Sequence, residues 1–281
     1  MEQSTYEADP LPSMAKRTKN DRALRFYHQV LGLERLHYGL WEPDDPETIA
    51  GLKRAQERYE TQLIDLIPEG ARRVLDVGCG TGEMSRALQG RGYEVEGLSP
   101  DVNQREPFGE KTNGAPYHFC CFEEFEPEGT YDCLMLSESA QYIPLPDLFR
   151  VADRALAPDG RVVLADYFVK DDATGPMSRS GHPIGRFDRL LREHGFEVLH
   201  EEDITDRTTP TLDLARGALD RYVFPALDIG TEKIRRRRPR TIRLLQWLFR
   251  KKIASLREEM ALLDSTEFAR HKRYRILILG R

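Results

Sequence analysis

A glycine-rich segment that follows a short apolar run constrains this chain more than any other feature. The run from Val74 to Val77 contains one acid, Asp76, and glycines follow at positions 78, 80 and 82 before a segment with helical spacing. Glycines let a backbone turn sharply and approach a ligand closely, and the N-terminus of a helix offers free amide donors. The order of strand, acid, glycines and helix therefore predicts a ligand site. The spacing matches neither the nicotinamide fingerprint nor a Walker loop.

Strands and helices alternate in the sequence after this segment. Strands are predicted at 73–77, 94–98, 117–121, 131–136, 161–168, 196–201 and 274–279. Helices are predicted between them at 83–91, 146–156 and 183–194. Apolar strands that alternate with helices are typical of an α/β fold with a doubly wound, mainly parallel sheet, here of seven strands.

The chain divides into five stretches by composition and pattern. Residues 1–21 are predicted to be a mobile tail, and 22–70 an N-terminal helical segment whose spacing suggests a helix up to Tyr38 and another over 46–67. Residues 71–203 form the predicted core and 273–281 its final strand. The intervening stretch, 204–272, is too long for a connection and is predicted to be a helical cap.

Composition describes an ordinary soluble protein. A length of 281 residues suits one domain with a sizeable cap, and no apolar run approaches the ~20 residues that span a bilayer. The four cysteines lack the spacing of metal ligands, so we expect no bound metal and a reducing, cytoplasmic location.

The formal net charge of −5 hides a basic segment. Residues 233–252 carry ten lysines and arginines and no acid, which leaves 32 basic against 47 acidic residues, or −15, in the remainder. Apolar residues around Trp247 lie among these cations on a helical projection, which suits an anionic membrane surface or an amphiphilic substrate. A neighbouring helix or a second subunit, as in a homodimer, could instead cover them. The acidic remainder argues against nucleic acid as a partner.

The glycine segment, VLDVGCGTG at 74–82, resembles the first motif of class I S-adenosylmethionine-dependent methyltransferases. LSPD at 98–101, YDCLMLSES at 131–139 and LAPDGRVVLADY at 156–167 resemble later motifs of that family in the same order. The resemblance implies a Rossmann-like fold, S-adenosylmethionine as cofactor, and methyl transfer to a small-molecule or lipid-like acceptor. A branch similar to cyclopropane fatty acid synthases and a non-catalytic, cofactor-binding partner subunit remain as alternatives.

The resemblance also implies which residues hold the cofactor. Asp76 would order the methionine amine, and the loop would pass beneath the methionine and ribose. Ser99 or Asp101 would replace the acid that usually binds the ribose, and the pair Phe122 and Glu123 would frame the adenine. The full set of expected cofactor residues is Asp76, Gly78, Cys79, Gly80, Gly82, Ser99, Asp101, Phe122, Glu123, Ser137, Tyr38 and Trp41.

Two residues after the fourth strand are the catalytic candidates. Glu138 and Tyr142 follow that strand at the carboxyl end, where open α/β sheets bind ligands. Methyl transfer needs a general base only when the acceptor atom carries a proton at reaction. Glu138 is thus a candidate for base chemistry or substrate orientation, with helix capping or solvation as the alternative. Tyr38 and Trp41 could close over the cofactor or merely pack the N-terminal helices.

Overall fold

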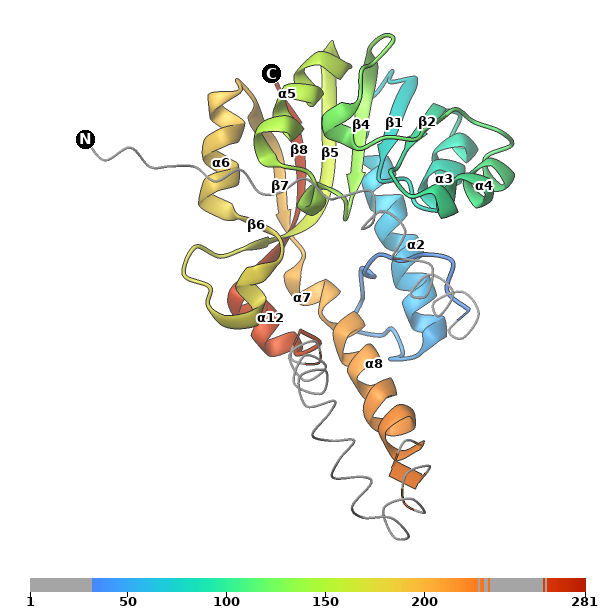
Figure 1. Ribbon diagram of the computed structural model, residues 1–281, viewed down its shortest axis with the longest axis vertical. Helices are drawn as coiled ribbons and strands as arrows, with labels where there is room; N and C mark the ends of the chain where they lie inside the picture. Colours follow the sequence, from blue (N-terminus) through green and yellow to red (C-terminus); the bar gives the residue numbers. More distant parts are fainter. Residues whose placement is uncertain (1–31, 227, 230–231, 233–259, 261) are drawn as a thin grey trace, which may run out of the picture.

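The structure, a computed structural model, describes residues 32–226, 228–229, 232, 260 and 262–281 (Figure 1). Its centre is one sheet with the strand order β3-β2-β1-β4-β5-β8-β7, and a two-residue strand, β6, pairs with β5. The strands are β1 (Arg73–Val77), β2 (Glu94–Leu98), β3 (Tyr117–His118), β4 (Tyr131–Ser137), β5 (Leu156–Val169), β6 (His182–Pro183), β7 (Glu197–Asp203) and β8 (Lys272–Gly280).

All pairings are parallel except those of β8, which runs antiparallel to both β5 and β7. The predicted doubly wound, mainly parallel sheet is confirmed. The predicted tail and the basic segment 233–252 lie outside the described residues.

Helices cover both faces of the sheet (Figure 1). They are α2 (Ile49–Asp65), α3 (Glu83–Gly90), α4 (Val102–Lys111), α5 (Leu145–Ala155), α6 (Ile184–Glu193), α7 (Thr205–Thr208), α8 (Pro210–Ala218) and α12 (Ser265–His271). Single turns are η2 (Phe122–Glu124), η3 (Ala140–Tyr142), η4 (Gly175–Arg179) and the π-turn η5 (Leu219–Val223).

Alternate residues of each central strand serve the two faces, as the pleat requires. In β4, Leu134 and Leu136 pack with α5 and α6, whereas Cys133 and Met135 pack with α2, α3 and α12. Both faces are therefore buried, which explains the continuous apolar sequence of this strand.

The helix α2 brings two polar residues to the carboxyl edge of the sheet. It begins after Thr48, whose Oγ1 accepts a hydrogen bond from the amide of Gly51 at 3.1 Å, and its apolar stripe is buried. Tyr59 and Glu60 lie on the buried side of this helix. Described helices of the predicted cap are α7, α8 and α12, and α8 extends away from the sheet (Figure 1). None of the helices in the described part of the chain is both long and apolar enough to cross a bilayer.

Three local predictions were wrong. The helix expected up to Tyr38 is absent from its described part, since residues 32–48 are irregular. There the backbone bonds to other elements: the Leu40 amide donates to the carbonyl of Ala55 at 2.9 Å. The helix α4 was not predicted because Pro107 and Gly109 interrupt its pattern. The strand β3 stops at His118, three residues before its predicted end.

The sheet also contains one glycine that is required for packing. A Cβ at Gly97 in β2 would lie 2.4 Å from the ring of Phe108, whereas a Cβ at Gly109 in α4 would meet nothing within 4 Å. We expect Gly97→Ala to lower the free energy of unfolding by about 1–3 kcal/mol through overpacking. Gly109→Ala should raise it by about 0.5–1 kcal/mol, since alanine is the better helix former. Urea denaturation measures both, and equal effects of the two variants would contradict this packing.

Candidate functional site

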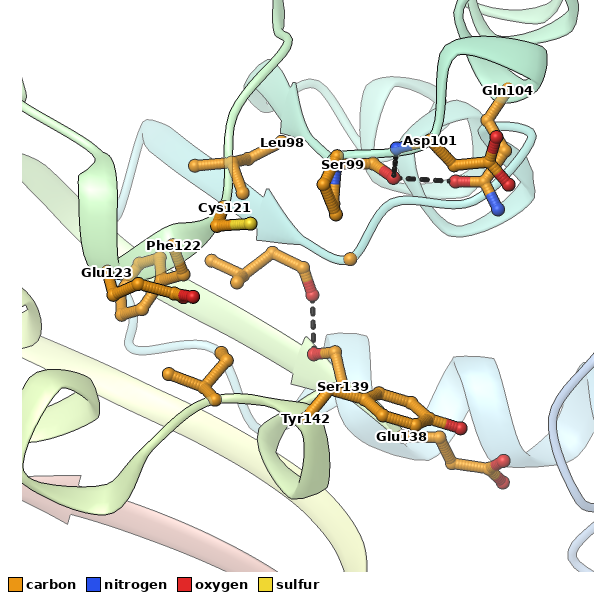
Figure 2. A pocket seen from close by; sticks show the side chains of 14 residues that line it. Leu98, Ser99, Asp101, Gln104, Cys121, Phe122, Glu123, Glu138, Ser139 and Tyr142 are labelled. Atoms are coloured by element: carbon orange, nitrogen blue, oxygen red, sulfur yellow. Dashed lines mark hydrogen bonds between the residues drawn. The ribbon is translucent and has the colours of Figure 1, made fainter. Parts of the chain in front are cut away.

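Two cavities lie at the carboxyl edge of the sheet, around the ends of β1, β2 and β4, and Figure 2 shows the larger one. Their volumes are about 420 and 250 Å³, and the residues common to both linings are Gly78, Gln104, Glu138 and Tyr142. They lie where the strand order reverses between β1 and β4, which is the usual ligand site of an open α/β sheet.

The glycine loop between β1 and α3 lines both cavities through Gly78 and the smaller one also through Gly80. Gly78, Gly80 and Gly82 have φ angles of +80°, +54° and +91°, a region that favours glycine. A Cβ at Gly78 would lie 2.4 Å from the Cβ of Ser139, whereas a Cβ at Gly80 would meet nothing within 4 Å. Gly78 thus allows β1 and the residues after β4 to approach each other, and Gly80 borders open space in the smaller cavity.

Asp76 lies beneath this loop and lines the smaller cavity. It is 2% exposed, and its Oδ2 accepts a hydrogen bond from Ser85 Oγ at 2.6 Å. Burial raises the pKa of this carboxyl to about 7, although the bond from Ser85 opposes the shift. Neutralising it by a cation would reverse the shift, so the position suits the ammonium group of a ligand.

Acidic side chains predominate in the smaller cavity. Its ionisable lining consists of Glu34, Glu60, Asp76, Glu83 and Glu138 with Arg35 and His37. Arg35 Nε donates to Glu60 at 2.8 Å, and Lys111 pairs with Glu83 at 2.6 Å. The lining therefore carries an excess of negative charge and favours a cationic part of a ligand.

The larger cavity combines an apolar floor with a polar rim. Leu98, Phe122 and Ile143 supply the floor, and Phe122 is also part of the hydrophobic core. Ser99 Oγ donates to Gln104 Oε1 at 2.7 Å on the rim (Figure 2).

Both predicted ribose candidates line the larger cavity. The Oδ1 atom of Asp101 also caps α4 by accepting from the amide of Asn103 at 3.0 Å, while Ser99 Oγ bonds to Gln104. Sequence reasoning missed Gln104 because it lies in the first turn of the unpredicted helix α4. Glu123 lines the larger cavity, and Cys79 and Ser137 line the smaller one.

Glu138 follows β4 with a φ of +53°, which is uncommon for a residue other than glycine. Its Oε1 accepts two hydrogen bonds of 2.6 Å, from the amide of Tyr38 and from the hydroxyl of Tyr274. Burial raises the pKa of this carboxyl, and the positive charge of His37 and the bond from Tyr274 act against that shift. Its carboxylate therefore caps no helix but is held at the junction of both cavities.

The other candidates occupy different surroundings. Tyr142 is 74% exposed at the cavity mouths. Neither Tyr38 nor Trp41 lines a cavity. Tyr38 packs on Tyr274 and contributes its amide to the site, while Trp41 is buried and donates to Thr211 Oγ1 at 2.9 Å. These contacts support the packing role for both rings.

Several site residues were missed by sequence reasoning. The ring of His37 stacks on Tyr59 at 4.6 Å, and its nitrogens face the carbonyl of Tyr38 at 2.7 Å and Glu60 at 3.3 Å. Burial lowers the pKa of the His37 ring, but the hydrogen bond to Glu60 and the negative charge of Glu60 raise it, and the net shift of the pKa is upward. No sequence motif surrounds these residues, and a helical apolar stripe accounts for Tyr59.

Asp166, at the carboxyl half of β5, was also missed. Its two oxygens accept from the amides of Gln141 at 2.9 Å and Tyr167 at 2.8 Å, and burial raises its pKa to about 8. It thereby shapes the turn η3 that carries Tyr142. Its signal in the sequence was its place at the end of an apolar strand.

Comparisons with known proteins agree with this geometry. A family model described as a methyltransferase domain matches residues 52–201. The chain is 28% identical over 218 residues to the methyltransferase GfsG of Streptomyces halstedii, covering 70% of this chain and 75% of that one. It is 26% identical over 200 residues to the 27-O-demethylrifamycin SV methyltransferase of Amycolatopsis mediterranei, covering 63% of this chain and 72% of the relative.

Solved structures share the fold along almost the whole length. Geranyl diphosphate C-methyltransferase from Streptomyces coelicolor, crystallised with S-adenosyl-L-homocysteine, superposes with a TM-score of 0.70 at 16% identity, covering 98% of this chain and 100% of that one. The cyclopropane synthase MmaA2 from Mycobacterium tuberculosis gives 0.69 at 17% identity, with coverage of 98% and 100%.

The structural likeness establishes the fold, and the family match covers more than half of the chain. S-adenosylmethionine has a cationic methionine end and an apolar adenine. The carboxylates of the smaller cavity and the apolar floor of the larger one are of a kind that suits these two parts. This chain belongs to the methyltransferase-domain family and is an S-adenosylmethionine-dependent methyltransferase.

Proposed function

We propose that this enzyme methylates a hydroxyl group of a small organic acceptor and that Glu138 is the general base. The observation that carries the proposal is a buried carboxylate, held by two hydrogen bonds, at the junction of two cavities. A base is needed only when the acceptor atom loses a proton during transfer, and a hydroxyl is such a group. O-methylation is also what the printed name of the rifamycin relative describes for that protein.

The linings support one orientation of the cofactor. The adenine would occupy the larger cavity against Leu98 and Phe122, with Gln104 and Ser99 toward the ribose. The methionine part would lie in the smaller cavity over Gly80, with its amine toward Asp76. Glu138 lines both spaces and would then lie next to the junction of the two parts of the ligand.

When bound, S-adenosylmethionine supplies an electrophilic methyl carbon on a sulfonium. The chain's own task is to align the acceptor oxygen with that carbon and to accept the proton that the oxygen loses. The ionised carboxylate of Glu138 can accept that proton, while the exposed ring of Tyr142 can orient the acceptor at the mouth.

Three predictions about the partners of this protein are not tested by the described residues. A lipid-like acceptor, an anionic membrane surface met by residues 233–252 and a homodimer all stay predictions, because the residues that bear on them lie outside the described part of the chain. The neighbour crystallised with geranyl diphosphate shows that this fold can hold an amphiphilic acceptor in that protein.

An acceptor panel tests the proposal. S-adenosylmethionine is incubated with the enzyme and a hydroxylated polyketide, an amine such as sarcosine, or geranyl diphosphate, and product mass and S-adenosylhomocysteine are measured. Methylation of the hydroxyl acceptor alone is expected. Methylation of the amine or of the prenyl carbon alone would contradict it, and a product that gains one CH₂ but loses a double bond would favour the cyclopropane-synthase-like alternative.

Asp76 makes cofactor affinity depend on pH. Its folded pKa of about 7 means that it is protonated in the free protein below neutrality, and binding an ammonium group requires its ionised form. We expect the affinity for S-adenosylmethionine to rise with pH up to about 7 and then level off. Below that point the affinity should change by up to about tenfold per pH unit. Isothermal titration calorimetry in buffers between about pH 5.5 and 8.5 measures this.

Asp76→Asn is the control for this dependence. It should bind more weakly above neutral pH and show a much flatter profile, because the titrating group is gone. A wild-type affinity that stays constant across the same range would show that Asp76 does not meet a cation.

A further inference from the structure

We infer that Tyr274 and Tyr59 are positioning residues for Glu138, and that a chain of hydroxyl groups from Ser137 through both tyrosines holds the carboxylate ready to accept a proton. The inference rests on the proposed role of Glu138 as base. Neither tyrosine lines either of the two cavities described above, so both would act through Glu138 rather than on a ligand there.

The distances form a continuous chain. Tyr274 Oη donates to Glu138 Oε1 at 2.6 Å, Tyr59 Oη lies 3.0 Å from Tyr274 Oη, and Ser137 Oγ donates to Tyr59 Oη at 3.3 Å. An ionised carboxylate only accepts, so Tyr274 must donate to it and can then accept from Tyr59. Tyr59 in turn accepts from Ser137. Each hydroxyl has a single direction in this chain.

The chain is built from three elements that are distant in sequence. Tyr59 comes from α2, Ser137 from the end of β4 and Tyr274 from β8, and both tyrosines are 0% exposed. Their rings meet edge to face with centroids 6.2 Å apart. Burial raises the pKa of both hydroxyls well above the usual value, so they stay protonated and remain donors.

The two carboxylate oxygens of Glu138 have different surroundings. The hydrogen bonds that the carboxylate of Glu138 receives from described residues, from Tyr38 and Tyr274, both end on Oε1. Oε2 is therefore the oxygen left to meet an acceptor. Donors to a carboxylate favour its ionised form, so the chain counteracts the effect of burial on Glu138.

Other charged and titratable groups also act on Glu138. His37 in the irregular N-terminal segment favours the ionised form of Glu138, and the charge of Glu138 in turn raises the pKa of Asp166, a buried acid of β5. Glu60 of α2 and Tyr142 of η3 share its cavity lining, and Lys272 of β8 faces Asp166. Because Tyr274→Phe changes none of these charges, it isolates the hydroxyl.

Titration of Glu138 itself tests the inference without an acceptor. Full-length protein labelled with [5-¹³C]glutamate is titrated by NMR, and the Glu138 signal is the one that Glu138→Gln removes. Tyr274→Phe should raise the pKa of Glu138 by about one unit, since a direct donor is lost. Tyr59→Phe should raise it by less. The control is Tyr131→Phe, which removes another buried tyrosine whose hydroxyl donates to Glu96 at 2.8 Å; it should leave the Glu138 signal unchanged.

The outcomes separate the two proposals. An unchanged titration in both Tyr274→Phe and Tyr59→Phe, with near-ultraviolet circular dichroism showing that they fold, would overturn the positioning role. So would an equal shift in Tyr131→Phe. If the tyrosine variants shift the titration but Glu138→Gln retains full turnover, the positioning role stands and the proposed function fails. If a hydroxyl acceptor is known, the acid limb of its rate profile should move in Tyr274→Phe by the same amount as the NMR titration.

Discussion

Glu138→Gln is expected to lower the rate of methyl transfer by about 10²–10⁴-fold, the usual contribution of a general base. The amide keeps the size of the side chain and can still accept from Tyr38 and Tyr274, so cofactor affinity should stay within about threefold of the wild type. Single-turnover assays with a hydroxyl acceptor measure the rate, and calorimetry measures the affinity.

The matched control is Glu94→Gln, which removes the same charge from an exposed side chain at the start of β2, outside both cavity linings. It should change the rate by less than about threefold, because no transferred proton reaches that carboxylate. The pH profile gives a second reading. Burial raises the pKa of Glu138, so its ionised form is lost as the pH falls, and the wild-type rate should fall with it. Glu138→Gln should lack this acid limb. Equal rates in the two variants would contradict the assignment of the base.

Gly80→Leu should abolish measurable cofactor binding, an effect of more than about 100-fold. A side chain at this position extends into the smaller cavity, where the methionine part of the cofactor is proposed to lie. The residue has a φ of +54°, so leucine also strains the backbone, and the strain needs its own control.

Gly92→Leu supplies that control. Gly92 lies in the turn between α3 and β2 with a φ of +92°, and a Cβ there likewise meets nothing within 4 Å. Both variants should therefore lose comparable stability, by about 1–3 kcal/mol, as judged by urea denaturation. Only Gly80→Leu should lose the cofactor. Retained micromolar affinity in that variant, or loss of affinity in Gly92→Leu, would place the methionine part elsewhere.

Local patterns in the sequence predict most of the sheet. The strands β1 and β2 match their predicted bounds because clear breakers lie on both sides of each, Gly70 and Gly78 around β1 and Gly92 and Pro100 around β2. The glycine loop was predictable from its glycines at alternate positions 78, 80 and 82. All three have positive φ angles, which favour glycine. The helix α4 could not be predicted from its pattern, because Pro107 and Gly109 weaken a helix that its Asp101 cap and its packing nevertheless stabilise.

The site was predictable only where it follows the strand ends. Glu138 and Ser99 were identified by their position after β4 and β2, and the structure brings both to the cavities. Tyr274, which binds Glu138, lies 136 residues away along the chain and reads in the sequence as one more aromatic residue of a strand. Such a partner is set by the tertiary fold.

The N-terminal segment shows the same limit of local patterns. Tyr38 and Trp41 were predicted from their aromatic character either to close over the cofactor or to pack the N-terminal helices. The Tyr38 backbone amide makes the contact instead, with Glu138, and the Trp41 ring packs against α2. A contact through the backbone amide does not depend on the type of side chain. The aromatic rings in the sequence therefore gave no sign of the contact that Tyr38 makes with Glu138.

A crystal structure with S-adenosylhomocysteine bound is the most direct test of the central claim, that the two cavities around the glycine loop form the cofactor site of a methyltransferase. We expect the adenine of S-adenosylhomocysteine to lie between Leu98 and Phe122, its amine to face Asp76, and its sulfur to lie next to Glu138. Ligand bound elsewhere on the protein, with both cavities empty at saturating concentration, would contradict it.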